Sequence, residues 1–364
     1  MNDQEPNNAE EPQTDTPAPM LLSRRRLLRM LAAVGGAVAA DMTIPAKWLP
    51  PVLRIGVLPV GAVSGEPGPY VWVEQFSATG SVLDRVWGVD AKNVWAVGNG
   101  GTIIKWDGSA WTAQTSGTTD HLFGIWGTDV NNVWAVGGSS SFCTILKWNG
   151  ATWTKQTNAT NTILTGVWGT DVNNVWAVGF NGIILKWDGA AWTTQTSGTT
   201  NHFRSIWGTD ANNIWAVGDG GIILKWNGNI WATQGGADTT QIYGIWGTDV
   251  NNVWAVGTEN ILLKWNGSTW GKSSIGEAKK LDGTPNNLFG IWGTDVNNVW
   301  LVGSGGIIRK WNGSTWAYEP NGMPRYFKGI WGTNVTTIWV VGEGGMILAK
   351  STPVTLPTPT PVNT

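Results

Sequence analysis

The chain has 364 residues, of which only 13% are charged, and its formal net charge at pH 7 is -2. This balance excludes the basic excess with which nucleic-acid-binding proteins neutralise phosphates. Cys143 is the single cysteine, so no disulfide forms within the chain, and two histidines offer few ligands for a metal site. Glycine and tryptophan, with 50 and 28 residues, far exceed ordinary usage.

Residues 1–40 predict a disordered acidic start followed by an export signal. The first 20 residues are acidic and rich in Pro, Asn and Thr. Ser23–Arg29, with the sequence SRRRLLR, then matches the twin-arginine signal, and residues 30–40 form a short apolar run with a small-residue end. This run is shorter than the roughly 20 residues of a membrane-spanning helix. We therefore expect export across the cytoplasmic membrane, to the periplasm, cell surface or medium, with no stable membrane span after signal cleavage.

Two further segments are predicted to lie outside the folded body. Residues 41–69 are rich in proline and are interpreted as a linker, and residues 351–364 form a Thr/Pro-rich tail. The folded domain is therefore predicted to span residues 70–350.

Tryptophans repeat through this domain with a regular spacing. A Trp-Gly pair recurs every 39–46 residues, and a second tryptophan follows each pair eight residues later. Each unit contains four short β-rich runs separated by Asn-Gly, Asp-Gly or Asp-x-Asn-Asn turns. Four strands in about 40 residues are typical of one propeller blade. Seven units predict an all-β, seven-bladed β-propeller; the Trp-Gly tryptophans are Trp87, Trp126, Trp168, Trp207, Trp246, Trp292 and Trp331.

The last unit is incomplete in sequence. It ends at Lys350 without its third and fourth tryptophans, whereas Trp72 lies 15 residues before Trp87, as Trp111 lies 15 before Trp126. The strand Tyr70–Phe76 is therefore predicted to complete the seventh blade and close the ring. Loss of this strand would leave an exposed sheet edge.

The units resemble the tryptophan-rich propeller repeats of exported bacterial proteins. More distantly, they are similar to the propellers of photosystem II assembly and stability factors and to the BNR/Asp-box repeats of sialidases. The Asp-box pattern is Ser-x-Asp-x-Gly-x-x-Trp; Lys186–Trp192 places its Asp and Trp one residue closer, and most units carry Asn instead of Asp. The similarity to the photosystem II factors implies a chaperone-like binding role, and the similarity to sialidase repeats implies glycoside chemistry.

Positions that differ between units indicate a candidate binding face. Four residues and one residue before each Trp-Gly tryptophan, the side chain is always apolar, which predicts packing between blades. Five and three residues before it, the residue varies from unit to unit. These positions lie where a fourth strand passes to the next first strand, on one face around the axis. The predicted binding face comprises Asp84, His121, His202, Arg204, Tyr243, Tyr326 and Lys328.

The scarcity of titratable groups favours a binding or scaffold protein, which presents this face to a protein or glycan partner, over an enzyme. We predict no catalytic residue, metal ligand or cofactor, and no nucleic-acid partner. The Asp-x-Asn-Asn segments are interpreted as turns capped by their own side chains, since calcium loops need six or more oxygens. The alternative is a glycoside hydrolase or lyase that uses the axial mouth, because carboxylates on different blades can meet without a local signature.

Overall fold

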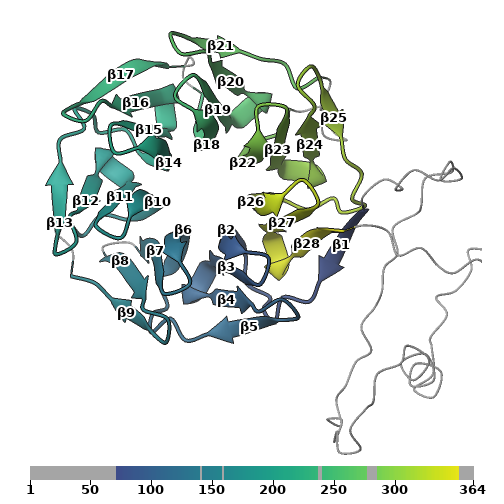
Figure 1. The fold of residues 1–364 in the computed structure, drawn as a ribbon, viewed down its shortest axis with the longest axis horizontal. Helices are drawn as coiled ribbons and strands as arrows, with labels where there is room; N and C mark the ends of the chain where they lie inside the picture. Colours follow the sequence, from purple (N-terminus) through teal and green to yellow (C-terminus); the bar gives the residue numbers. More distant parts are fainter. Residues whose placement is uncertain (1–70, 140–141, 158–159, 237–239, 277–284, 352–364) are drawn as a thin grey trace, which may run out of the picture. The chain divides into compact units, whose positions relative to one another are not determined.

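The computed structural model describes residues 71–139, 142–157, 160–236, 240–276 and 285–351. These residues form seven four-stranded antiparallel sheets, which surround a central axis as the blades of a propeller (Figure 1). The predicted fold class is confirmed. The segments predicted as disordered start, signal peptide, linker and tail lie outside the described residues, apart from Ser351.

Each blade is built in the same order, from the axis to the rim. The innermost strands are β2 (Leu83–Asp90), β6 (His121–Asp129), β10 (Leu164–Asp171), β14 (Phe203–Asp210), β18 (Ile242–Asp249), β22 (Leu288–Asp295) and β26 (Phe327–Asn334). The second strands are β3 (Asn93–Gly98), β7 (Asn132–Ser139), β11 (Asn174–Gly179), β15 (Asn213–Gly218), β19 (Asn252–Gly257), β23 (Asn298–Gly303) and β27 (Thr337–Gly342). The third are β4 (Ile103–Trp106), β8 (Phe142–Trp148), β12 (Ile184–Trp187), β16 (Ile222–Trp226), β20 (Leu262–Trp265), β24 (Ile308–Trp311) and β28 (Ile347–Ser351). The outer strands are β5 (Trp111–Gln114), β9 (Trp153–Lys155), β13 (Trp192–Gln195), β17 (Trp231–Gly236), β21 (Trp270–Lys272), β25 (Trp316–Tyr318) and β1 (Val71–Gln75).

The first strand of the chain closes the ring. β1 pairs antiparallel with β28, in the same sheet as β26 and β27, with Trp72 opposite Lys350. The Trp72 indole Nε1–H donates to Glu319 Oε2 of blade 6 over 3.1 Å. The prediction that the N-terminal strand completes the last blade is therefore confirmed; Tyr70 lies outside the described residues, and the strand ends at Gln75, one residue earlier than predicted.

The tryptophans form the packing between blades. The second tryptophan of each unit is buried, as in Trp95 and Trp134, both 0% exposed. In six of the seven blades its ring stacks on the Trp-Gly tryptophan of the same blade, with 6.0 Å between the Trp87 and Trp95 centroids. The following glycine makes room for the neighbouring blade, since a Cβ on Gly127 would lie 2.8 Å from the ring of Trp87. The repeated motif is thus explained by wedge-shaped interfaces that large flat rings fill.

Short turns join the strands. The Asp129 Oδ1 atom accepts a hydrogen bond from the backbone N–H of Asn131 over 2.8 Å, so the Asp-x-Asn-Asn turn is capped by its own side chain, as predicted. In the part of the chain that is described, the helices are six three-residue 3-10 turns: η1 (Asn99–Gly101), η2 (Phe180–Gly182), η3 (Asp219–Gly221), η4 (Thr258–Asn260), η5 (Ser304–Gly306) and η6 (Glu343–Gly345). Within those same residues, no helix is long and apolar enough to cross a membrane.

Candidate binding site at the axial mouth

The seven innermost strands each contribute one side chain to a ring at one end of the axial channel. This side chain comes three residues before the Trp-Gly tryptophan, immediately after a buried apolar residue such as Leu83, which is 0% exposed. In every innermost strand the pairing with the second strand shifts at this residue, as between Leu83 and Arg85, and this β-bulge leaves Asp84 outside the register, with its side chain at the cavity. The ring, which we call the mouth, encloses a cavity of about 200 Å³ and consists of Asp84, Phe123, Thr165, Arg204, Tyr243, Phe289 and Lys328.

The mouth gathers four of the seven residues of the predicted face: Asp84, Arg204, Tyr243 and Lys328. The other three, His121, His202 and Tyr326, come five residues before their Trp-Gly tryptophans and do not line the cavity. Phe123, Thr165 and Phe289 line it and were not in the predicted set, although they occupy the same variable position and could have been found from it.

Two ion pairs balance charges at the mouth. Lys328 Nζ lies 2.8 Å from Asp84 Oδ1, which joins blades 7 and 1. Asp84 is only 7% exposed, so Lys328 neutralises a buried carboxylate, and Lys328→Ala would destabilise the fold as well as alter the surface. Arg204 makes a bidentate pair with Asp219 over 2.8 and 2.7 Å, and its guanidinium lies 5.2 Å from the ring centre of Phe180.

Aromatic rings form the opposite wall. The Tyr243 and Phe289 ring centroids are 5.2 Å apart, and Phe289 lies 6.3 Å from Tyr326, which is 40% exposed at the rim. The Tyr243 hydroxyl donates to Gln241 Oε1. Burial raises the pKa of Tyr243, against a lowering by the positive charge of Arg204, so the phenol stays protonated at neutral pH.

The two histidines bind to neighbouring turns and do not share a site. His121 stacks on Phe123 with 5.9 Å between ring centroids, and its Nδ1 lies 2.8 Å from Asn99 Oδ1. His202 stacks on Phe180 at 4.4 Å and accepts a hydrogen bond from the backbone N–H of Asn181 over 3.0 Å. In the described ranges, no three His, Cys, Asp or Glu side chains are placed to hold a metal ion.

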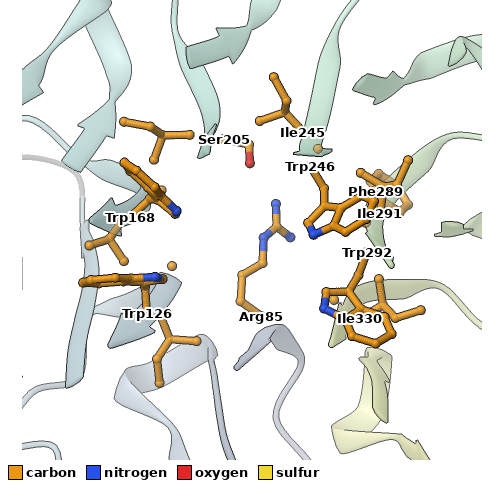
Figure 2. A pocket seen from close by; sticks show the side chains of 18 of the residues that line it. Arg85, Trp126, Trp168, Ser205, Ile245, Trp246, Phe289, Ile291, Trp292 and Ile330 are labelled. Carbon is orange, nitrogen blue, oxygen red and sulfur yellow. The ribbon is translucent and has the colours of Figure 1, made fainter. Parts of the chain in front are cut away.

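Arg85 forms the floor of the mouth and was absent from the predicted face. It projects from β2 into the axial channel, between Trp126 and Trp168 on one side and Trp246 and Trp292 on the other (Figure 2). The channel below it has a volume of about 150 Å³. Arg85 could have been found from the sequence, because the equivalent residue is glycine in five of the other blades and Ser205 in the sixth.

Comparison with known proteins supports the fold. The chain matches no protein-family model and no curated protein. It is similar in structure to YCF48 bound to D1 peptide, with 16% identity over 80% of this chain and 99% of that chain and a TM-score of 0.64. YCF48 from Cyanidioschyzon merolae gives 16% identity, 77% and 99% coverage, and a TM-score of 0.64. The WD40 β-propeller domain of Doa1 is 11% identical over 79% of this chain and 98% of that chain, with a TM-score of 0.65.

The fold is that of a seven-bladed propeller. Because these identities are so low, the similarity establishes the architecture and leaves the activity to be argued from the site itself.

Proposed function

We propose that this protein is an exported binding protein whose mouth receives a segment of a protein partner. The observation that carries the proposal is the contrast between framework and mouth. The apolar residue before each mouth position and the Trp-Gly pair after it repeat around the ring, whereas the seven mouth positions carry six different residue types. Packing between equivalent blades favours equal residues; a single asymmetric partner favours different ones.

The chemistry of the mouth supports binding. The mouth combines charged groups with the rings of Phe123, Tyr243 and Phe289, a combination typical of contact centres in protein interfaces. Asp84 is the one carboxylate among the described residues that line the cavity, and it pairs with Lys328. Glycoside hydrolysis usually requires two carboxyl groups flanking the scissile bond. The mouth therefore supports the binding function better than the hydrolase or lyase alternative.

One of the structural neighbours adds support by analogy. YCF48 has been captured with a D1 peptide, so a propeller of this architecture accommodates a peptide of a protein partner. A glycan partner remains the competing form of the same function, and its recognition would use the same aromatic wall.

Photo-crosslinking in the producing cells tests the proposal. A benzoylphenylalanine placed at Tyr326, at the rim, should crosslink one defined protein. The matched control is the same group at Val89, which is 38% exposed at the other end of an innermost strand. Adding Tyr243→Ala and Phe289→Ala should abolish the adduct from the rim. Crosslinks from Val89 alone would contradict the choice of face. If the protein binds a sugar on a glycan array and Tyr243→Ala with Phe289→Ala abolishes that binding, the partner is a glycan and not a protein.

Export is the second half of the proposal and rests on Ser23–Arg29, which lies outside the described residues. Replacing Arg24, Arg25 and Arg26 together by Lys is required, because Arg25 and Arg26 form a second pair after single changes. We expect the triple variant to accumulate in the cytoplasm on cell fractionation. Normal amounts of this variant outside the cytoplasmic membrane would refute the twin-arginine route.

A further inference from the structure

Arg85 departs from the repeat at a position where the fold is tightest. The equivalent residues on the other innermost strands are Gly124, Gly166, Ser205, Gly244, Gly290 and Gly329. A Cβ on Gly329 would lie 3.0 Å from Cα of Arg85, so small residues let neighbouring strands approach around the axis. Blade 1 instead carries a long cationic side chain.

The Arg85 guanidinium lies in the channel and contacts the backbone of three innermost strands. Nη1 donates to the carbonyl oxygens of Asp84 at 3.0 Å and Lys328 at 3.2 Å, and Nη2 donates to that of Tyr243 at 3.3 Å. These carbonyls belong to blades 1, 7 and 5, so the side chain spans the axis (Figure 2). Arg85 accordingly borders both the mouth and the tryptophan-lined channel below it.

The charge of Arg85 has no hydrogen-bonded counter-ion within the described residues. Its three hydrogen bonds all go to neutral carbonyl groups, and a guanidinium has five N–H donors. Asp84 is close enough for its charge to raise the pKa of Arg85, but its Oδ1 pairs with Lys328 and its Oδ2 accepts no hydrogen bond from the described side chains. Desolvation by the surrounding protein is the larger effect and lowers the pKa of Arg85.

The mouth therefore carries an excess positive charge at its floor. Arg85 and Lys328 contribute two positive charges against one negative charge from Asp84, which leaves +1, while Arg204 and Asp219 cancel. A desolvated cation gains most from an anion that also accepts its remaining N–H groups. A carboxylate fits this requirement because its two oxygens match the planar fork of a guanidinium.

We propose that Arg85 is the carboxylate-binding residue of the mouth and holds an acidic side chain or the chain terminus of the partner. This assignment rests on the proposed function and names the group that the partner inserts. The cavity of about 200 Å³ has room for one side chain or chain end, and the rings of Phe123, Tyr243 and Phe289 line its walls. The fixed carbonyl contacts hold the guanidinium ready, so little rotamer entropy is lost on binding.

Titration with small probes tests the assignment without knowledge of the partner. The arginine Nε–H resonances of the ¹⁵N-labelled protein are followed by NMR during addition of acetate at constant ionic strength. Acetamide, which has the same shape and no charge, is the control ligand. We expect a saturable shift of the Arg85 resonance with acetate and none with acetamide. Two short alanine peptides then show which carboxylate is bound. One has a free C-terminus, and the other is amidated at its C-terminus and contains a single Glu side chain.

The variants separate this assignment from the proposed function. Arg85→Ser introduces the residue that blade 4 already carries at Ser205, so the ring is expected to fold, as circular dichroism would verify. This substitution should weaken acetate binding about tenfold or more, as expected when a charge-assisted hydrogen bond is lost. Because the variant lacks the Arg85 resonance, its binding is followed through the tryptophan indole resonances. Lys92→Ser removes an equal charge from an exposed position and should leave binding unchanged.

Four outcomes decide the matter. Loss of acetate binding in Arg85→Ser and its retention in Lys92→Ser support the assignment. Equal acetate binding in Arg85→Ser and the unaltered protein overturns it. No saturable response in the unaltered protein, together with a defined crosslink from Tyr326, overturns the role of Arg85 and leaves the mouth as the binding face. Acetate binding at Arg85 without any crosslink from the rim contradicts the proposed function instead.

Discussion

Replacing Trp72 by Ala should open the ring at its closing blade. The Trp72 side chain is 9% exposed and packs in the interface between blades 6 and 7 with Trp300, Phe327 and Ile330. Its indole shares the Glu319 Oε2 atom with Trp300, whose Nε1–H donates over 3.3 Å. Within its blade β1 pairs with β28 alone, so the packing of Trp72 between the blades adds to the few contacts that hold this strand.

The expected cost follows from the burial of the ring. Burying an indole of about 150–250 Å² at about 25 cal/mol/Å² gives roughly 4–6 kcal/mol as an upper estimate. Measured truncations of buried aromatic residues cost about 3–5 kcal/mol, and we expect Trp72→Ala to fall in that range. Trp72→Phe keeps most of the packing and removes the hydrogen bond to the Glu319 carboxylate, at a cost of about 1.5–3 kcal/mol.

Equilibrium unfolding in urea measures both values from the shift in midpoint at constant slope. Val73→Ala is the matched control, because Val73 lies on the same strand, is 41% exposed and should change stability by no more than about 0.5 kcal/mol. If Trp72→Ala unfolds at the same urea concentration as Val73→Ala, the Trp72 ring does not stabilise the closing blade and the argument fails.

Three further predictions concern single groups. The pKa of Asp107 is lowered to about 2 by the Ser109 hydroxyl and by backbone N–H groups of its turn, and that of Asp171 is lowered by the same kind of contacts. A depressed carboxylate pKa contributes stability above the unfolded value of 3.8, so urea midpoints should fall as the pH drops from about 4 towards 2, and less so in Asp107→Asn. Burial raises the pKa of Cys143 to about 12, so a thiol-disulfide dye at pH 8 should label it only after denaturation; rapid labelling of the folded protein would contradict its burial. Glu319→Gln removes the 2.8 Å ion pair with Lys350 and should lower the free energy of unfolding by up to about 3 kcal/mol. Adding Lys350→Trp restores the residues found at these positions in other blades, and in a double-mutant cycle it should recover most of the lost stability. A double variant no more stable than Glu319→Gln would count against this explanation.

The repeat determined the architecture because each blade must meet the same packing problem. The spacing of Trp-Gly pairs predicts seven blades, and the 15-residue interval from Trp72 to Trp87 assigns β1 to the last of them. The invariant apolar position before the mouth predicts a buried side chain, and Leu83, Leu122 and Phe203 are all 0% exposed. Such conclusions need only the repeat itself, since equivalent residues of equivalent blades face the same interface, whereas the β-bulge between Leu83 and Arg85 is seen only in the structure.

Only the closed ring decided which variable residues meet. Lys328 and Asp84 are 244 positions apart, and the carbonyl that accepts a hydrogen bond from Arg85 Nη2 is 158 positions away, on the far side of the axis. The period makes residues equivalent, but contact across a channel depends on its radius and on the reach of each side chain. His121 and His202 stand at equivalent positions and still bind to separate turns, whereas Arg85 reaches the axis because it alone combines a long side chain with a position where the other innermost strands carry glycine or serine.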